Sequence, residues 1–379
     1  MPIIPLSLYI HFPWCLRKCP YCDFNSYPLP SSQEQSRVAY TDKLLFDLEN
    51  EAKNAVDRQL SSIYFGGGTP SLLPPNEIRK IINRVKNLFD LAPDIEITLE
   101  ANPGAINLEA CEGFKDAGVD RISLGVQSFN DDKLKRIGRI HTAEQAQEAI
   151  NAIKQTKFAS FNLDIMFGLP GQNVDAAMSD LQTTLSFSPP HLSWYQLTLE
   201  PKTSFAANPP ILPANEELWD IQQAGQKLLE QSGLLQYEVS AYSKPGCECR
   251  HNVNYWQYGD YLGIGAGAHG KITLGSGEVR RYWKISGPNE YLQAQDSLID
   301  GEKTVAPKDI PFEFMLNALR LYRPISYALF RECTGVTIDA IIKELRHAQN
   351  LGLIELQKDS IITTIKGKNF LNDLLEIFL

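Results

Sequence analysis

Three closely spaced cysteines near the start of the chain constrain its chemistry more than any other feature. Cys15, Cys19 and Cys22 form a C-x3-C-x2-C array directly after a short apolar run, residues 7–12. Three thiolates are able to hold three irons of a cubic four-iron four-sulfur (4Fe-4S) cluster, whereas a ferredoxin-type cluster uses four cysteines. The fourth iron then keeps an open coordination position. The array therefore predicts a 4Fe-4S cluster that binds a further ligand.

Other uses of the cysteines fit the sequence less well. A closed structural zinc site needs four nitrogen or sulfur ligands, and the next candidate pair, Cys247 and Cys249, stands in a distant part of the chain. A disulfide framework is not favoured, because seven cysteines in 379 residues are sparse and odd in number. Residues 1–12 lack the basic start of a signal peptide, so we expect this segment to be retained and the protein to be cytoplasmic.

Length and charge narrow the class of protein further. A chain of 379 residues with 43% hydrophobic and 10% aromatic content is long enough for a domain of TIM-barrel size and a smaller one. The net charge of −9 argues against a general nucleic-acid or anionic-membrane surface. We therefore expect no nucleic-acid partner and at most a peripheral membrane contact.

Strand-like and helix-like segments alternate through the first half of the chain. Six short apolar segments predict buried parallel strands: residues 7–12, 62–65, 95–100, 121–126, 161–166 and 192–199. Helical patterns lie between them: residues 33–59, 76–89, 107–117, 143–155 and 174–186. The alternation predicts an α/β fold, a partial TIM-like (β/α)6 barrel, whose chemistry takes place at the carboxyl ends of the strands.

Glycines or polar residues stand at most of these strand ends. The second strand leads into residues 66–70, Gly-Gly-Gly-Thr-Pro, where missing side chains allow a ligand to meet backbone groups directly. Glu100 and Gln127 end the third and fourth strands, Arg139 and His141 lie beyond the fourth, and Asp164 lies inside the apolar fifth strand. A glycine triplet alone is typical of a tight turn, and each polar residue alone is typical of a cap or a satisfied core group. Together they predict a lined pocket.

This combination of motifs resembles the radical S-adenosylmethionine (SAM) family, in the group related to oxygen-independent coproporphyrinogen III oxidase. The motifs that carry the resemblance span most of residues 7–270: Tyr9-Ile-His-Phe-Pro-Trp-Cys15-x3-Cys19-Pro-Tyr-Cys22, Gly66-Gly-Gly-Thr-Pro70, Glu100, Gly125-Val-Gln127 and Gly168-Leu-Pro-Gly171. The resemblance implies a radical SAM barrel in which the methionine amine and carboxylate of SAM chelate the open iron. An electron from the cluster, supplied by a donor protein, would cleave the sulfonium to a 5′-deoxyadenosyl radical. It also implies SAM contacts at nine positions: Tyr9, Tyr21, Gly67, Gly68, Thr69, Glu100, Gln127, Arg139 and Asp164.

Two departures separate the chain from the oxidase itself. The oxidase carries another cysteine two residues after its third cluster ligand, where this chain has Phe24, and it has a sizeable N-terminal extension that precedes the barrel. These departures argue against porphyrinogen oxidation. With these departures, the chain resembles a subgroup that binds haem and delivers it to acceptor proteins, such as respiratory haem enzymes. The implied partners are a haem donor and haem acceptors; whether two chains pair as a homodimer stays open.

A second motif agrees with a haem role. Residues 251–256, His-Asn-Val-Asn-Tyr-Trp, match the H-N-x-x-Y-W segment of that subgroup, which implies His251 as an axial ligand with Tyr255 and Trp256 against the macrocycle. Without the resemblance, a histidine in such a run is more typical of a hydrogen-bonded turn than of a ligand. The glycine-rich residues 263–270 lack the context of a dinucleotide loop, and we expect a close backbone approach to SAM or haem there, with His269 as a second ligand candidate.

The pattern changes towards the C-terminus. Residues 312–321 and 336–350 are helix-like, residues 353–356 and 360–364 predict a hairpin, and residues 367–378 predict a last helix. We therefore divide the chain into a barrel core (1–200), a connecting segment with the histidine and glycine motifs (201–300) and a small helical, winged-helix-like C-terminal domain (301–379). That shape does not imply DNA binding, and we expect a lid or a partner-docking unit instead.

The sequence favours the first of three functions, and the second is its main alternative. The first is a haem chaperone that binds a 4Fe-4S cluster, SAM and haem. The second is a catalytically active radical SAM enzyme that acts on a tetrapyrrole. The third is an iron-sulfur or zinc protein in which the metal is only structural.

Overall fold

Six parallel strands form the centre of the structure, a computed structural model that describes residues 4–30 and 33–379. The strands are β1 (Leu6–Phe12), β4 (Gln59–Gly67), β5 (Asp90–Ala101), β6 (Arg121–Gln127), β7 (Ser160–Phe167) and β8 (His191–Gln196). Each pairs in parallel with the next in chain order, which confirms the six predicted strands and the α/β class. Residues 1–3 of the predicted uncleaved segment lie outside the described residues.

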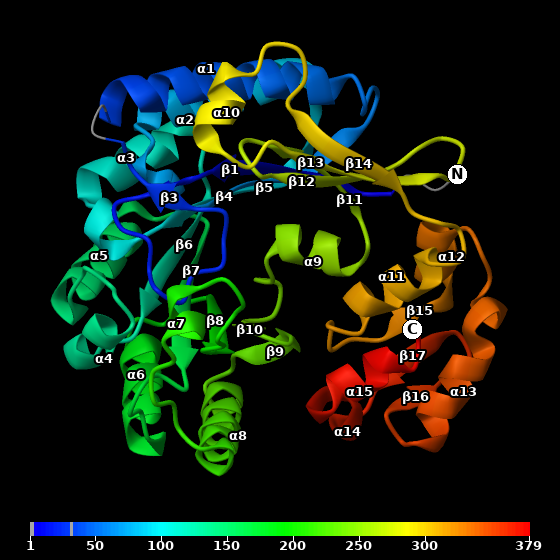
Figure 1. Cartoon of the computed structure of the whole chain (residues 1–379). Helices are drawn as coiled ribbons and strands as arrows, with labels where there is room; N and C mark the ends of the chain where they lie inside the picture. The colour runs from blue at the N-terminus through cyan, green and yellow to red at the C-terminus, as the bar shows by residue number, and fades with distance from the viewer. Residues whose placement is uncertain (1–3, 31–32) are drawn as a thin grey trace.

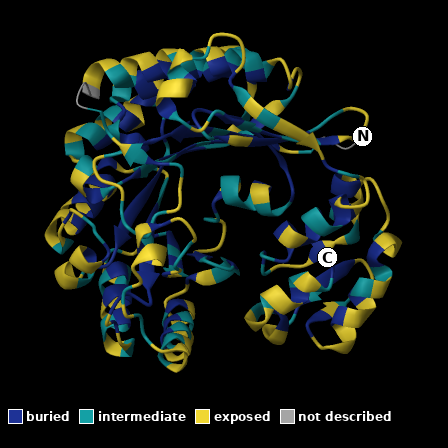
Figure 2. Cartoon of the chain, in the orientation of Figure 1, coloured by how far each residue is buried: buried dark blue, intermediate teal, exposed yellow. Residues whose placement is uncertain are grey.

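Amphipathic helices cover the outer face of this sheet (Figure 1). They are α1 (Gln33–Ala52), α2 (Pro75–Leu88), α3 (Leu108–Ala117), α5 (Ala143–Thr156), α6 (Val174–Ser186) and α8 (Asn215–Gln231), with the short α4 (Asp131–Arg136) and α7 (Ser204–Ala207) near the strand ends. In α2, Ile78, Ile81, Ile82 and Val85 recur at helical spacing, and all four are buried. Figure 2 shows the same division, with buried strands inside and exposed helix faces outside.

The first helix is shorter than the sequence predicted. The helical pattern of residues 33–59 ends at Ala52. Asp57 adopts a left-handed backbone with φ of 61°, and β4 already begins at Gln59. The turn that connects them therefore takes residues that the pattern assigned to the helix.

The sheet continues beyond the six central strands on both sides. The added strands are β9 (Leu235–Glu238), β10 (Ala241–Ser243), β11 (Asp260–Ile264), β12 (His269–Thr273), β13 (Val279–Lys284) and β14 (Ile299–Thr304). β11 pairs in parallel with β1, and β12, β13 and β14 follow it in antiparallel order, while β10 and β9 extend the edge at β8. Residues 201–300, which the sequence analysis treated as a connecting segment, thus supply five strands and the start of a sixth to the same sheet.

The C-terminal part packs around a hydrophobic core of its own, which includes Phe314, Phe330 and Leu345. Its helices are α11 (Ile310–Ala318), α12 (Tyr327–Thr334) and α13 (Ile342–Asn350), and a three-stranded sheet of β15 (Ile325–Ser326), β17 (Ser360–Thr363) and β16 (Ile354–Leu356) completes a winged-helix-like unit. The β16–β17 hairpin confirms the predicted one. The predicted last helix is two short helices, α14 (Ile365–Asn369) and α15 (Leu371–Glu376), because Phe370 leaves helical geometry with φ −117° and ψ 46°.

No helix in the described residues has the length and apolarity that crossing a bilayer requires.

A buried cluster of charges holds α1 to the extended side of the sheet. The ammonium of Lys284 on β13 lies 2.7 Å from a carboxylate oxygen of Asp47 and also contacts Glu51, and all three side chains are almost fully buried. The second oxygen of Asp47 accepts a bond from the backbone N–H of Gly265 at 3.0 Å. The cluster therefore also fixes the turn between β11 and β12.

Lys284→Met should strongly destabilise the fold. The substitution leaves two carboxylates buried without their cation, which costs about 3 to 5 kcal/mol in comparable pairs. We expect a loss of that size in the free energy of unfolding from urea titration. Arg136→Met, which breaks the exposed pair with Asp132, is the matched control and should change it by less than about 1 kcal/mol. Equal effects of the two substitutions would contradict this view of the Lys284 cluster.

Candidate functional site

The cysteine loop lies at the carboxyl end of β1 and is fastened to the end of β4. Gly68 and Thr69 donate their backbone N–H groups to the carbonyls of Phe12 at 2.7 Å and Trp14 at 2.9 Å. A two-stranded parallel pairing of β2 (Trp14–Cys15) with β3 (Tyr27–Pro28) closes the loop. The loop thus presents its cysteines beside the glycine-rich turn.

All three cysteines of the array are unpaired and half-buried. Burial raises the pKa of the Cys15 and Cys22 thiols above the usual value, so iron binding to thiolates would release protons. No group of three or more His, Cys, Asp or Glu side chains in residues 4–30 and 33–379 converges on a point that suits a single metal ion. A cubane does not require such convergence, because each thiolate binds a different iron.

One cavity unites the cysteines with most of the predicted SAM contacts; we call it the cluster cavity. Its walls include Cys15, Cys19 and Cys22 together with eight predicted residues: Tyr21, Gly67, Gly68, Thr69, Glu100, Gln127, Arg139 and Asp164. The guanidinium of Arg139 lies 3.8 Å from the sulfur of Cys19. The ninth predicted residue, Tyr9, lies on the wall of a neighbouring cavity.

The glycine turn requires small residues because backbone atoms surround it. A Cβ on Gly68 would lie 2.6 Å from the carbonyl oxygen of Trp14, and one on Gly67, where φ is +111°, would overlap the ring of His11. Contact of this kind leaves no room for a side chain. Contact with neighbouring protein groups therefore requires glycine at these positions, whether or not a ligand also contacts the turn.

Glu100 is the main carboxylate on the cavity wall. One of its oxygens accepts the hydroxyl of Tyr64 at 2.9 Å, and the other accepts the backbone N–H of Gly67 at 3.2 Å. Burial raises the pKa of this carboxyl to about 7. Hydrogen-bond donors of a ligand, such as ribose hydroxyls or an ammonium group, would favour its ionised form.

Gln127 enters the cavity through an irregular strand end. Its φ is +70°, and the pairing of β6 with β7 shifts register between Gly125 and Gln127. A bulge of this kind redirects a side chain, and a left-handed backbone at a residue other than glycine marks a strained position. The amide oxygen of Gln127 accepts the hydroxyl of Tyr195 at 2.8 Å.

The sequence analysis missed several polar residues of the cluster cavity, among them Asn102, Ser123 and Tyr195. Asn102 donates to the hydroxyl of Thr69 at 2.8 Å and accepts from Arg139 at 2.6 Å, which joins two predicted residues. Asn102 stands directly after β5, two positions after Glu100. This place at a strand end was the sequence signal from which it could have been predicted. Ser123 and Tyr195 are inward positions of buried strands and carry no local signal.

The neighbouring cavity contains the histidine motif, and we call it the histidine cavity. It has a volume of about 580 Å³, and its walls include His251, Tyr255, Trp256, Tyr9 and His269. Gly67, Glu100 and Phe24 line both cavities, so the two adjoin. Phe24, which replaces the extra cysteine of the oxidase, is 62% exposed at this shared wall.

His251 lies on α9 (Arg250–Trp256), and its ring packs on the sheet. The ring stacks on Tyr64 with centroids 4.7 Å apart, and Nδ1 lies 3.3 Å from the hydroxyl of Ser62. Burial, followed by the charge of Arg121, lowers the pKa of the imidazole to about 3. The ring is therefore neutral at physiological pH, as iron ligation requires, and within the described residues Nε2 makes no hydrogen bond.

The start of α9 is held by a carboxylate from β5. Glu96 accepts from the backbone N–H of His251 at 3.4 Å and from the thiol of Cys249 at 3.4 Å. Burial raises the pKa of Cys249 to about 12, so its thiol is protonated and donates this hydrogen bond. Arg250, the cation of the motif, pairs with Asp94 on the surface.

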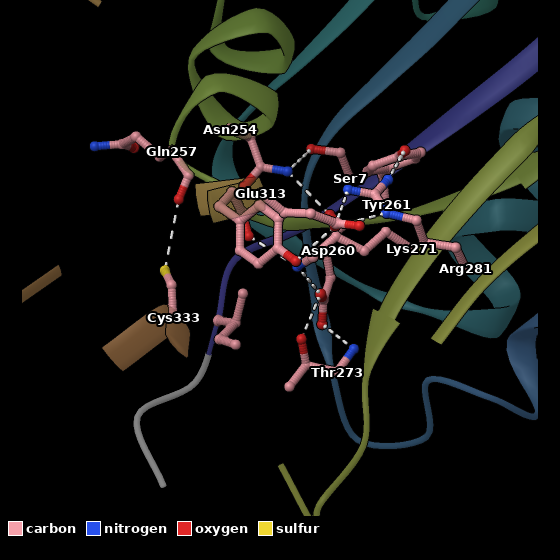
Figure 3. Close-up of polar contacts among 12 residues, drawn as sticks. Ser7, Asn254, Gln257, Asp260, Tyr261, Lys271, Thr273, Arg281, Glu313 and Cys333 are labelled. Atoms are coloured by element: carbon pink, nitrogen blue, oxygen red, sulfur yellow. Dashed lines mark hydrogen bonds and ion pairs between the residues drawn. The ribbon is translucent and has the colours of Figure 1, made fainter. Parts of the chain in front are cut away.

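The end of α9 is joined to a buried polar network, which Figure 3 shows. Asn254 donates to the hydroxyl of Ser7 at 2.8 Å and to the carbonyl of Asp260 at 2.9 Å. Asp260 forms a fully buried pair with Lys271 at 2.9 Å. Through these bonds the last turn of the helix is fixed to the first strand of the sheet.

The same end of α9 also contacts the C-terminal unit. The thiol of Cys333 donates to the carbonyl of Gln257, and Glu313 accepts from Arg281 and from the hydroxyl of Tyr258. In Figure 1, α9 lies between the sheet and the C-terminal helices. The segment that carries His251 is thus held by both parts of the chain.

The other histidines near the site differ in their freedom to bind a ligand. Both ring nitrogens of His11 are engaged, with Tyr9 and with the carbonyl of Asn25. His141 is buried against the carbonyl of Val126. His269, the second candidate, is exposed on the histidine cavity wall and packs near Trp283. Its imidazole is therefore more accessible than those of His11 and His141.

The glycine-rich turn after β11 approaches protein groups closely. A Cβ on Gly265 would meet the carbonyl of His11 at 2.3 Å, and one on Gly267 would meet the amide of Asn25 at 2.2 Å. Of these two glycines, Gly267 lines the histidine cavity. The expected close backbone approach is thus made mainly to the cysteine loop.

The residues present suit both the cluster and the nucleoside. Three half-buried thiols open on one cavity, and a backbone turn without side chains, a carboxylate and a guanidinium converge beside them. Such a donor set matches a 4Fe-4S cluster with one open iron and a ligand that has carboxylate, ammonium and hydroxyl groups.

Comparisons with known proteins concern the family and the fold of the chain. The family model described as the radical SAM superfamily matches residues 9–183, and the one described as the HemN C-terminal domain matches residues 305–370. The haem chaperones HemW of Haemophilus influenzae and Escherichia coli are 47% and 46% identical to this chain, and each match covers 99% of this chain and 98% of the relative. The structure of coproporphyrinogen III oxidase (HemN) from Escherichia coli, a radical SAM enzyme, covers 100% of this chain and 91% of that chain with a TM-score of 0.83. The TM-score of this match shows a shared fold, and at 24% identity the match shows the fold alone.

Gly68→Ala should destabilise the site by forcing two loops apart. The new methyl group would overlap backbone atoms of Trp14 and Pro13, which are not free to rotate away. We expect a loss of about 1 to 3 kcal/mol in the free energy of unfolding. Gly275→Ala, on an exposed turn with no atom within 4 Å, is the control and should change it by less than about 0.5 kcal/mol. An unchanged unfolding midpoint for Gly68→Ala would show that the two loops are not in tight contact.

Proposed function

The chain belongs to the HemW family of radical SAM proteins, and on this basis we propose that it is a haem chaperone. It binds a 4Fe-4S cluster, SAM and haem, and it delivers haem to acceptor proteins. The observation that carries the proposal is the free Nε2 of a neutral imidazole, His251, on the wall of an aromatic cavity of haem size.

His251 acts as the axial ligand of the haem iron in this proposal. Tyr64 and Ser62 orient the ring from one side, and Glu96 fixes the start of its helix. Tyr255 and Trp256 offer flat apolar faces to the macrocycle. The cavity is open enough to release its cargo, because Tyr255 and Phe24 are 37% and 62% exposed. Acceptor proteins would therefore meet the haem at this side of the molecule.

Cys15, Cys19 and Cys22 hold the cluster, and the wall residues of the cluster cavity orient SAM. When bound, the cluster would supply one electron to the sulfonium of SAM. The charge of Arg139 favours a ligand carboxylate, Glu100 is placed to accept from hydroxyl or ammonium groups, and Gly67 and Gly68 leave space for the ligand beside the backbone. An electron donor is required if the cluster is redox-active in the working cycle.

A second candidate, radical chemistry on a tetrapyrrole, is favoured by the wall that the two cavities share. Gly67 and Glu100 face both cavities, so a tetrapyrrole in one would lie next to SAM in the other. Anaerobic incubation with a reductant and coproporphyrinogen separates the two functions. Repeated formation of 5′-deoxyadenosine with loss of coproporphyrinogen identifies the enzyme, and haem uptake without such turnover identifies the chaperone.

His251→Ala should weaken haem binding by about tenfold or more, which corresponds to ~1.4 kcal/mol. The reason is loss of the axial ligand from an otherwise intact cavity. The measurement is an anaerobic haem titration of the reconstituted protein, followed at the Soret band, with subsequent transfer to an apo-haem protein. His347→Ala, on the exposed side of α13, is the control. Haem binding to His251→Ala with the affinity and spectrum of the parent would refute the assigned ligand.

A further inference from the structure

Tyr64 contacts a functional group in each cavity, the carboxylate of Glu100 and the imidazole of His251. It lies on β4, and its hydroxyl donates to Glu100 at 2.9 Å. Its ring stacks on His251 with centroids 4.7 Å apart and an angle of 29° between planes. One side chain therefore contacts both the carboxylate of the cluster cavity and the imidazole of the histidine cavity.

The contacts around Tyr64 leave it little freedom to move independently. Tyr9, on the neighbouring strand, stacks on Tyr64 and also packs against His251, at 6.3 and 6.2 Å between centroids. His251 is held again by Ser62, two positions earlier on β4. A change in the position of the Tyr64 ring is thus passed directly to the imidazole.

A ligand on Glu100 changes the bond that Tyr64 makes. The carboxyl has a pKa raised to about 7 by burial, so near neutral pH it exists in both protonation states. Donor groups of SAM favour the ionised carboxylate. A hydrogen bond from a hydroxyl to an ionised acceptor is shorter and roughly twice as strong as one to a neutral acceptor. SAM on Glu100 would therefore hold Tyr64, and with it the stacked imidazole, more firmly.

We propose that Tyr64 is a positioning residue that couples the two cavities, so that SAM strengthens haem binding to His251 and haem strengthens SAM binding. The coupling rests on the proposed function, because it needs both ligands. Thermodynamic linkage requires the two effects to be equal in size. A chaperone with this coupling holds haem best when its nucleoside is bound and releases it more readily when the nucleoside leaves.

The test compares affinities with and without the other ligand in the anaerobically reconstituted full chain. We expect saturating SAM to lower the haem dissociation constant of the wild type by about fivefold or more. Haem should lower the SAM dissociation constant by the same factor in equilibrium dialysis. For each ligand, the coupling ratio is its dissociation constant without the other ligand divided by that with it. Tyr64→Phe keeps the ring and removes the hydroxyl, so both coupling ratios should fall close to one, whatever the absolute affinities.

Tyr242→Phe is the matched control. Tyr242 is a buried tyrosine of β10 that lines neither cavity, and its variant should keep the wild-type ratios. A wild type that binds haem through His251 equally well with and without SAM overturns the coupling alone. Full coupling in Tyr64→Phe also overturns it. A wild type that takes up no haem, or binds it independently of His251, refutes the proposed function instead.

Discussion

The parallel pairing of β1 with β4 is the constraint on which the rest of the structure depends. It places the cysteine loop after β1 beside the glycine turn after β4, where Gly68 and Thr69 donate to the carbonyls of Phe12 and Trp14. The same register sets Tyr9 opposite Tyr64. Because parallel strands end at one edge, residues far apart in sequence meet there without long connections. Both cavities are formed along this single edge.

The histidine cavity depends on a helix of seven residues that does not stabilise itself. α9 is fixed at its start by Glu96 of β5, in its last turn by Asn254 and Ser7, and just beyond its end by Cys333. These anchors belong to the central sheet and to the C-terminal unit. The position of His251 is therefore a property of the whole fold, and haem uptake should respond to changes in either part.

Much of this arrangement was predictable from the sequence. The six central strands have continuous apolar runs, and the rule that parallel strands end at one edge brings the strand-end residues Glu100 and Gln127 into the cavity with the cysteines. The resemblance to a family supplied the histidine motif. Tyr9 lies on the other cavity, because its side chain follows the register of β1 and not the position of a strand end.

Other features depend on tertiary contacts that leave no local pattern. Ser123 and Tyr195 look like ordinary strand residues, and only pairing with neighbouring strands aims them at the cavity. The short strands β9–β14 have weak signals, so residues 201–300 read as a connection until their partners are known. The sequence does not show what surrounds Cys249, whose thiol meets the carboxylate of Glu96 from a distant strand.

Metal and sulfide analysis of the anaerobically reconstituted protein tests the central claim most directly. The account places a 4Fe-4S cluster on three thiolates beside the histidine cavity, so it predicts about four irons and four sulfides per chain with visible charge-transfer absorption. Cys19→Ser should lose both. Stoichiometric zinc in place of iron and sulfide, or a cluster that survives Cys19→Ser intact, would contradict it.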